Sequence, residues 1–313
     1  MSELAIPVRA PFDFAQTRAR IAAFPPCQGD VILDGDGLIG AHAVGAHAHA
    51  WRLRPGPTAA ALRLELADAP PPEAATAVAA LVAAMVSADD DLADFYARAD
   101  GDHPAFRAVV ARHHGLHQVR FPSLAEVTCY AVLAQRTPMT VATALKRRLA
   151  VAFGAAAQFG GHRLTAFPTL ATLAAVPEPE LAALLGAPEK ARRMTAAVAA
   201  VAALGEPWLR TAPYPRAAAA LHAVRGLGPF SVGMILLRGL GRPDHLDPRG
   251  APFDAAGRAI YGDAWDPAAI ERRYGVTIGT WAYYLRVAAP PRARTFARPR
   301  PAPGAASARP VGW

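Results

Sequence analysis

Apolar and polar residues alternate with a period of two in the first seventy residues of the chain. Trp51 to Arg54 and Leu62 to Leu66 show this alternation, which is typical of half-buried strands. Val31 to Leu33 runs into the turn signal Asp34-Gly-Asp-Gly, and Leu38 to Gly40 leads out of it. The pattern predicts a small antiparallel β domain over residues 1–72.

After the break at residues 67–71 (Ala-Asp-Ala-Pro-Pro), the apolar spacing becomes helical and stays helical to about Ala288. The stretches punctuated by Pro, Gly and Asp predict helices over 92–99, 123–134, 139–153, 170–176, 179–185, 188–204 and 214–224. The predicted fold class is therefore α+β, with the β domain followed by an all-α domain at residues 73–289.

Residues 290–313 are dense in Pro, Arg, Ala and Gly and hold few apolar anchors. This composition predicts a disordered tail, because such a segment cannot bury enough apolar surface to offset the entropy of ordering. Its arginines could attract phosphates without regard to sequence, or merely keep the protein in solution.

Composition narrows the class of partner. The 313 residues are 53% hydrophobic and 19% charged, and 33 basic against 25 acidic residues give a net charge of +8. This excess favours a polyanionic partner. We expect a cytoplasmic, nucleoid-associated bacterial protein outside the membrane, because the chain has two cysteines, no signal-like N-terminus and no apolar run of about 18 residues.

The most informative stretch runs from Leu221 to Gly233 and contains Gly226-Leu-Gly-Pro-Phe-Ser. It predicts the end of one helix, a tight turn, and a second helix starting near Pro229. Such a turn presents free backbone N–H groups to the outside, where they can bind one DNA phosphate.

With its neighbours this stretch resembles the helix-hairpin-helix DNA glycosylase superfamily, and within it the 3-methyladenine DNA glycosylase II family. Three anchors over about residues 92–288 carry the resemblance: Asp91-Leu-Ala-Asp-Phe-Tyr-Ala-Arg-Ala with Gly115-Leu-His-Gln-Val-Arg-Phe-Pro-Ser, then Tyr130-Ala-Val-Leu-Ala-Gln-Arg-Thr-Pro-Met, and the hairpin continuing into Met234-Ile-Leu-Leu-Arg-Gly-Leu-Gly-Arg-Pro-Asp. The β domain ahead of them also suits this family.

The resemblance implies base excision from double-stranded DNA that contains a modified base. Such enzymes flip the damaged nucleotide out of the stack and hydrolyse its N-glycosidic bond, as the first step of base excision repair. By the resemblance, the hairpin grips the DNA backbone through Gly226, Gly228, Phe230 and Ser231. Gln135 and Arg136 would fill the hole left in the duplex, or would simply be surface residues at a helix end.

One departure from the family concerns the acid. The superfamily places a carboxylate just after the hairpin, and that position is Gly250 in this chain. The candidate replacements are Asp254, one helical turn later, and Asp247, in the preceding loop. A third alternative is that neither carboxylate acts as the catalytic acid. The alternative is therefore a catalytically inactive protein of this fold that binds damaged or modified DNA without excising a base.

Further departures bear on mechanism and cofactors. Family members that also nick the strand carry a lysine where this chain has Phe230, so we expect a monofunctional enzyme. We expect no cofactor and no metal, since the chain has neither a four-cysteine cluster nor converging ligands around its histidines. Tyr130, Trp281 and Tyr283 could line a base pocket, although Trp281 also suits a helical core. The sequence does not identify the excised base, which could be an alkylated purine, an oxidised base or a hypermodified phage base. We expect a monomer.

Overall fold

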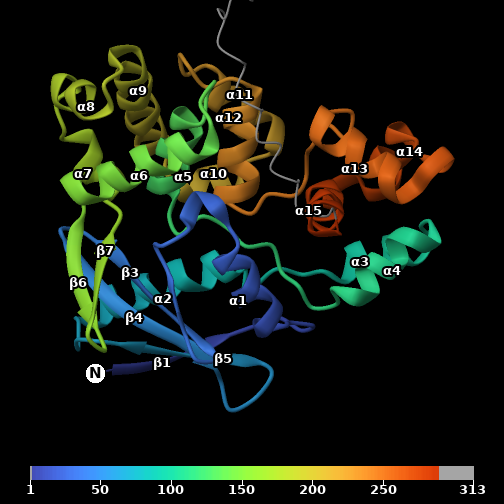
Figure 1. Cartoon of the computed structure of the whole chain (residues 1–313), viewed down its shortest axis with the longest axis horizontal. Helices are drawn as coiled ribbons and strands as arrows, with labels where there is room; N and C mark the ends of the chain where they lie inside the picture. The colour runs from blue at the N-terminus through green and yellow to red at the C-terminus, as the bar shows by residue number, and fades with distance from the viewer. Residues whose placement is uncertain (1, 289–313) are drawn as a thin grey trace, which may run out of the picture.

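The computed structural model describes residues 2–288 of the chain (Figure 1). A five-stranded antiparallel sheet comes first, with the strand order β1-β5-β4-β3-β2. Its strands are β1 (Ser2–Pro7), β2 (Ile32–Asp34), β3 (Gly37–Val44), β4 (His47–Pro55) and β5 (Ala61–Leu66). The strands predicted around residues 31–40, 51–54 and 62–66 are confirmed, and Gly35 (φ +57°) makes the turn between β2 and β3. The sheet also gains β1 at its edge, where Leu4 lies opposite Leu64.

Helix α2 (Pro72–Val86) covers one face of this sheet. Val78, Val82 and Met85 are buried against Leu38, Leu53 and the neighbouring apolar side chains of the sheet. A short helix that the period-two reading missed, α1 (Phe14–Ala22), precedes β2. Asp13 starts this helix, because its side chain accepts a hydrogen bond from the backbone N–H of Gln16 at 2.9 Å.

The prediction that only helices follow one another after residue 73 is wrong at one place. Strands β6 (Ala155–Phe159) and β7 (His162–Ala166) form a hairpin that turns at Gly160 and Gly161, with φ values of +53° and +82°. Phe159 and Leu164 are buried against Ile39 and Ala50 of the main sheet, and this burial favours strand in a run of alanines. The domain boundaries at residues 72 and 289 stay a prediction, and the tail at 290–313 lies outside the described residues.

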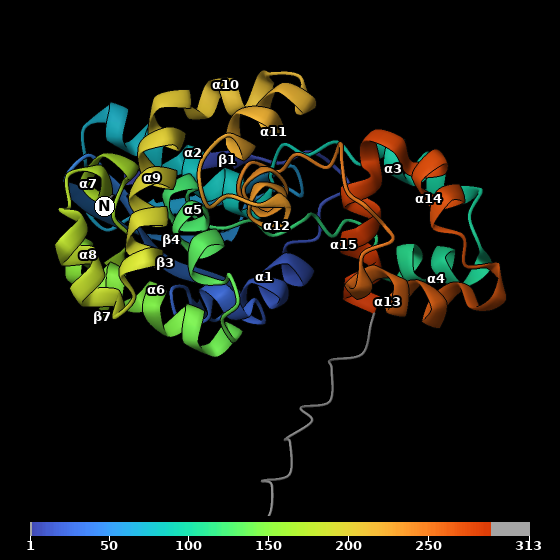
Figure 2. The ribbon, with the colours of Figure 1, turned by 90° about the horizontal axis from the view of Figure 1, so that it is seen from above.

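The remaining helices form two lobes (Figures 1 and 2). The hairpin lobe consists of α5 (Leu124–Leu133), α6 (Met139–Phe153), α7 (Leu170–Ala174), α8 (Glu178–Leu185), α9 (Pro188–Leu204), α10 (Glu206–Thr211), α11 (Tyr214–His222), α12 (Pro229–Gly233) and the π-helical segment η2 (Met234–Gly239). The terminal lobe consists of α3 (Ala93–Asp100), α4 (Pro104–Arg112), α13 (Ala251–Tyr261), α14 (Pro267–Tyr274) and α15 (Ile278–Ala288). Short 3₁₀ turns lie at η1 (Pro25–Cys27), η3 (Gly262–Ala264) and η4 (Gly275–Thr277).

The terminal lobe is organised around aromatic side chains and one buried carboxylate. The hydroxyl groups of Tyr261 and Tyr274 both donate to Asp102 Oδ2, at 2.8 and 2.5 Å. Trp281 is fully buried and its Nε1 donates to the Tyr261 hydroxyl at 2.9 Å. Because α3 and α4 precede the hairpin lobe in the chain, the two lobes are joined by two crossings of the chain. The α+β class is confirmed.

Candidate functional site

The predicted hairpin is present between α11 and α12. Gly226 has φ +96°, and a Cβ there would lie 2.6 Å from Arg193 Cγ, so both the backbone angle and the close packing require glycine. Gly228 caps α12 from an extended conformation, and Pro229 is the first helical residue, as predicted. Phe230 projects from the turn with 59% of its surface exposed. The geometry leaves the hairpin accessible to a large partner.

Ser231, by contrast, points inward. It is 1% exposed, and its Oγ donates to the carbonyl of Ala131 at 3.1 Å and accepts from Gln135 Nε2 at 3.0 Å. The side chain therefore fixes the hairpin to α5 and leaves the backbone to face the outside.

The segment between α5 and α6, residues 134–138, forms a second exposed loop beside the hairpin; we call it the wedge loop. Gln135 is tied down, because its Nε2 donates to Gly226 O at 2.6 Å and its Oε1 accepts from Arg193 at 3.2 Å. Arg136 is exposed at the tip, with a left-handed backbone (φ +50°). Sequence reasoning treated the two residues alike, whereas the structure gives Gln135 an internal role and leaves Arg136 accessible.

Lys190 of α9 fixes the wedge loop through three hydrogen bonds. Its ammonium donates to Leu133 O at 3.0 Å, to Gln135 O at 2.9 Å and to Thr137 Oγ1 at 2.8 Å. Burial lowers the pKa of Lys190, and the nearby Arg193 lowers it further. These bonds satisfy carbonyls at the C-terminal end of α5 that the helix itself leaves without partners.

Between the wedge loop and the hairpin lies a groove of about 820 Å³, which we call the hairpin groove. A second hollow of about 530 Å³, the interlobe cavity, opens between the hairpin lobe and the terminal lobe. His222, Pro229 and Phe230 line both, so the groove and the cavity adjoin. A volume of this size is typical of a site for a small organic molecule.

Of the two predicted carboxylates, only Asp247 lines the interlobe cavity, together with Gly250. The Asp247 side chain is 64% exposed, and its Oδ1 accepts from the backbone N–H of Arg249 at 2.9 Å and lies 3.3 Å from the Arg249 guanidinium. The carboxylate therefore sits at the rim of the cavity and is partly neutralised there.

Asp254 points elsewhere. Its two oxygens accept from Arg258 Nε at 3.0 Å and from Trp265 Nε1 at 2.9 Å. The hydrogen bond from Arg258, and to a smaller extent the one from Trp265, lowers the pKa of Asp254, so this carboxylate stays ionised. Helix α13 begins at Ala251 with Gly250 as its N-cap, and this start places Asp254 beside the aromatic side chains of the terminal lobe.

The three aromatic residues predicted to line a base pocket also lie in different parts of the molecule. Tyr283 lines the cavity, and its hydroxyl accepts a long hydrogen bond of 3.4 Å from the backbone N–H of Val119. Tyr130 packs in the core of the hairpin lobe against Phe121, with ring centroids 5.3 Å apart. Trp281 is core in the terminal lobe, the alternative that the sequence already offered.

Sequence reasoning missed several residues of the cavity wall, among them Tyr214, His222, Arg238 and His245. Arg238 had a signal, since it interrupts the apolar run Ile235-Leu-Leu-Arg-Gly-Leu in the π-helical segment η2. A π-helical segment inside a helix often marks a functional site. His245 stands near Tyr214, with ring centroids 5.1 Å apart.

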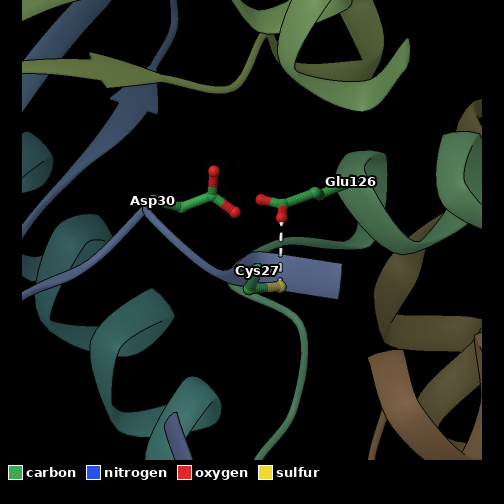
Figure 3. A group of neighbouring side chains, drawn as sticks. All are labelled: Cys27, Asp30 and Glu126. Atoms are coloured by element: carbon green, nitrogen blue, oxygen red, sulfur yellow. Dashed lines mark hydrogen bonds between the residues drawn. The ribbon is translucent and has the colours of Figure 1, made fainter. Parts of the chain in front are cut away.

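Among the described residues, one group of side chains has the spacing of metal ligands: the buried Cys27 and Glu126 with the half-buried Asp30 (Figure 3). Cys27 Sγ donates to Glu126 Oε1 at 3.3 Å. Lys146 Nζ bonds to both carboxylates, so an ammonium already occupies the space between them. Burial raises the pKa of Glu126 and of the Cys27 thiol, which keeps the thiol protonated. The group acts as an ion-pair cluster, and we call it the Lys146 cluster.

Comparisons with known proteins agree with this geometry. No family model matches the chain. The DNA-3-methyladenine glycosylase of Bacillus subtilis is 28% identical over 157 residues, which span 50% of this chain and 52% of that protein. The probable bifunctional transcriptional activator/DNA repair enzyme AlkA of Mycobacterium tuberculosis is 34% identical over 148 residues, 46% of this chain and 29% of that protein. The matches therefore span about half of the first relative's length and less than a third of the second's.

Solved structures show the fold. The 3-methyladenine DNA-glycosylase of Archaeoglobus fulgidus superposes with a TM-score of 0.74 at 17% identity, over 91% of this chain and 97% of that one. The 8-oxoguanine glycosylase/lyase of Clostridium acetobutylicum gives 0.64 at 14% identity, over 91% and 95%. No helix within residues 2–288 is both long and apolar enough to cross a membrane. The resemblance found in the sequence is confirmed.

Proposed function

We propose that this chain, which has the fold of the helix-hairpin-helix DNA glycosylases and sequence similarity to their 3-methyladenine branch, excises a modified base from double-stranded DNA. The observation that carries the proposal is the junction of the hairpin groove with the interlobe cavity at His222, Pro229 and Phe230. A DNA backbone held at the hairpin would have a cavity of base-binding size directly beside it.

The geometry supports different roles for the hairpin and the wedge loop. The hairpin offers backbone N–H groups around Gly226 and Gly228 to a phosphate, and Arg136 is the exposed side chain that can enter the stack. Flipping costs a few kcal/mol, and less for a damaged or mispaired base, which gives one source of selectivity. The flipped base would enter the interlobe cavity past Phe230 and stack near Tyr283.

Chemistry at the sugar then needs a water and a group that receives its proton. Asp247 at the cavity rim is the carboxylate we propose for that role, since Asp254 is held by Arg258 and Trp265 away from the cavity. Bond cleavage leaves a free base and an abasic site.

We further propose that the enzyme is monofunctional. Phe230 stands where strand-nicking relatives have their lysine, Lys146 is buried between two carboxylates, and Lys190 is bound beneath the wedge loop. None of the described residues that line the cavity is a lysine. The product should therefore be an intact strand with an abasic site, which stays whole on a gel until alkali is added. A nick formed without alkali would contradict this.

The second candidate is a protein that recognises modified DNA without excision. Gly250 at the family's carboxylate position favours it, as do the ion pairs that engage Asp247 and Asp254. Double-stranded DNA is the partner in both proposals, and the monomeric state and nucleoid location stay predictions.

The deciding experiment measures free base released from duplexes that carry one alkylated, deaminated, oxidised or hypermodified base. Mass spectrometry identifies the base, and the wild type is compared with Asp247→Asn and with Asp254→Asn as the matched control. We expect Asp247→Asn to slow release about a hundredfold, a usual loss for an acid–base group, and Asp254→Asn to change it little. Tight binding with no release from any duplex would leave the second candidate.

A further inference from the structure

His245 lies in the loop between η2 and α13 and lines the interlobe cavity. The residue is exposed, and within residues 2–288 neither nitrogen of its ring has a hydrogen-bond partner. Its ring packs against the ring of Tyr214, which also lines the cavity, with the centroids 5.1 Å apart and the planes at 43°. Both ring nitrogens are therefore available to a molecule that enters the cavity.

A stack of side chains from two segments of the chain holds this imidazole. The Cζ of Arg242 lies 5.2 Å from the ring centroid of Tyr214. Arg242 is itself fixed, because its Nη2 donates to Asp244 Oδ2 at 2.7 Å. Its Nη1 donates to the carbonyls of Leu209 and Ala212 at 3.1 and 2.6 Å. The imidazole is thus positioned before any substrate arrives, which lowers the entropy that a reaction step there would lose.

The imidazole is the group in the cavity wall best suited to give up a proton. The other titratable or charged residues that line the cavity are Tyr214 and His222 of α11, Arg238 of η2, Asp247 of the same loop, and Tyr283 and Arg286 of α15. Arginines keep their protons throughout the physiological range. Burial raises the pKa of Tyr214 and of Tyr283, so their hydroxyls are weak acids. No ring of residues 2–288 stacks on His222 and no group there hydrogen-bonds to it, so its imidazole lacks a comparable support.

From this placement we propose that His245 is a catalytic residue that donates a proton to the departing base when that base is uncharged, so that the enzyme excises uncharged bases as well as cationic ones. This rests on the proposed excision function and names a second substrate class for the same site. A base that already carries a positive charge departs as a neutral molecule and needs no proton. An uncharged base departs as an anion unless an acid protonates it, and histidine is the side chain most often used for such a transfer near neutral pH.

The protons and electrons of this step balance. The bond between C1′ and the base breaks, its electron pair goes to the base, and a ring nitrogen of the base takes the proton of the His245 imidazolium. Water adds its oxygen to C1′ and gives one proton to the Asp247 carboxylate. Because His245 and Asp247 are both exposed, solvent can carry that proton from the carboxyl group to the neutral imidazole, which restores the enzyme.

The test measures single-turnover release of hypoxanthine, an uncharged base, and of 7-methylguanine, which is cationic in DNA, from otherwise identical duplexes. His245→Gln keeps a polar side chain but cannot transfer a proton. His162→Gln is the matched control, because His162 is also exposed but lies on β7, outside the cavity. We expect His245→Gln to slow hypoxanthine release about a hundredfold and to change 7-methylguanine release little, and His162→Gln to change neither.

The pH dependence and chemical rescue test the proton transfer itself. Hypoxanthine release by the wild type should fall as the pH rises from about 5 to about 8, the range in which histidines titrate, and this fall should be absent in His245→Gln. His245→Ala opens a space beside Tyr214 that imidazole from solution can enter. Added imidazole should therefore restore hypoxanthine release in this variant and leave 7-methylguanine release unchanged.

The outcomes separate this inference from the proposed function. Equal slowing of both bases by His245→Gln, or no rescue of His245→Ala by imidazole, would mean a structural role and would overturn the inference. Release of 7-methylguanine but not of hypoxanthine by the wild type would also overturn it, while the excision function would stand. Release of no base from any duplex would overturn both.

Discussion

Arg136 has a backbone conformation that non-glycine residues rarely adopt. Its φ of +50° lies at the tip of the wedge loop, and such a conformation costs about 1 kcal/mol or more. This strain at an exposed position is the observation behind the wedge role proposed for Arg136. The bonds from Lys190 and Gln135 are what hold the loop in this state.

We predict that Arg136→Gly raises the stability of the protein and lowers its activity. The glycine should relieve the strain and raise the melting temperature by a few degrees. Base release should fall at least about tenfold, because nothing would fill the hole in the duplex. Calorimetry and the release assay measure the two effects. Arg136→Asn, which tolerates the same backbone, serves as control and should also lose release. Full activity in both variants would exclude a wedge role.

His42 gives a prediction about pH. It is 4% exposed, its Nδ1 accepts from Trp51 Nε1 at 2.7 Å, and its Nε2 lies 3.1 Å from Pro122 O. The bond from Trp51 requires an unprotonated Nδ1, so the ring is neutral with its proton on Nε2, which donates to Pro122 O. Burial lowers the pKa of His42 from 6.5 to about 4, and the hydrogen bond to Pro122 opposes this only partly.

Because the unfolded state binds the proton more tightly, the contribution of His42 is complete above about pH 6.5 and is lost as pH falls toward 4. The loss should approach 3 kcal/mol, at about 1.4 kcal/mol for each unit of pKa shift. Urea unfolding at several pH values measures it. His42→Gln cannot titrate, so the difference between wild type and variant should shrink as the pH is lowered. A difference that does not change with pH would contradict this assignment.

At the scale of elements, the wedge loop and the hairpin form one unit. Gln135 connects them, since its Nε2 donates to both Gly226 O and Ser231 Oγ. We predict that Gln135→Glu, equal in size, breaks the connection because a carboxylate cannot donate and would repel the carbonyl of Gly226. Stability should fall by about 1–3 kcal/mol, and DNA affinity should fall with it. Gln16→Glu, on the remote helix α1, is the matched control. Unchanged hydrogen exchange in the hairpin would contradict the coupling.

Elements with strong local signals were predictable from the sequence. The bounds of α6 and α9 match the prediction, and α12 starts at Pro229 as expected, because proline and glycine set these ends. The hairpin β6–β7 was missed, since Ala155 to Ala157 carry no strand signal and only burial against the sheet decides their state.

The candidate site was predictable only in part for the same reason. The hairpin residues follow from local turn chemistry. The separation of Asp247 from Asp254, and of Tyr283 from Tyr130, depends on how the two lobes face each other. Gly279 illustrates this: it lines the interlobe cavity, and a Cβ there would lie 2.7 Å from Pro243 Cα, so glycine permits the close packing of α15 on that loop. Contacts between distant segments leave no periodic signal.

At the scale of the whole molecule, the Lys146 cluster joins the N-terminal segment to the hairpin lobe. Asp30 lies between η1 and β2, while Glu126 and Lys146 are on α5 and α6. The side chains of Lys146 and Glu126 are 2% and 4% exposed. A buried pair of this kind adds little over a well-packed apolar pair, but removing one partner leaves an uncompensated charge.

We therefore predict that Lys146→Met destabilises the protein by about 3–5 kcal/mol, measured by urea unfolding. Methionine restores the volume of the side chain but leaves the two carboxylates facing each other without the ammonium. Adding Glu126→Gln should recover most of the loss, because it removes the buried charge and keeps a group that can accept from Cys27. Arg147→Met, on the same helix with an exposed side chain bonded to Gln28 O, is the control and should cost less. Equal losses in the single and double variants would mean that packing, and not the buried charge, joins the two parts of the molecule.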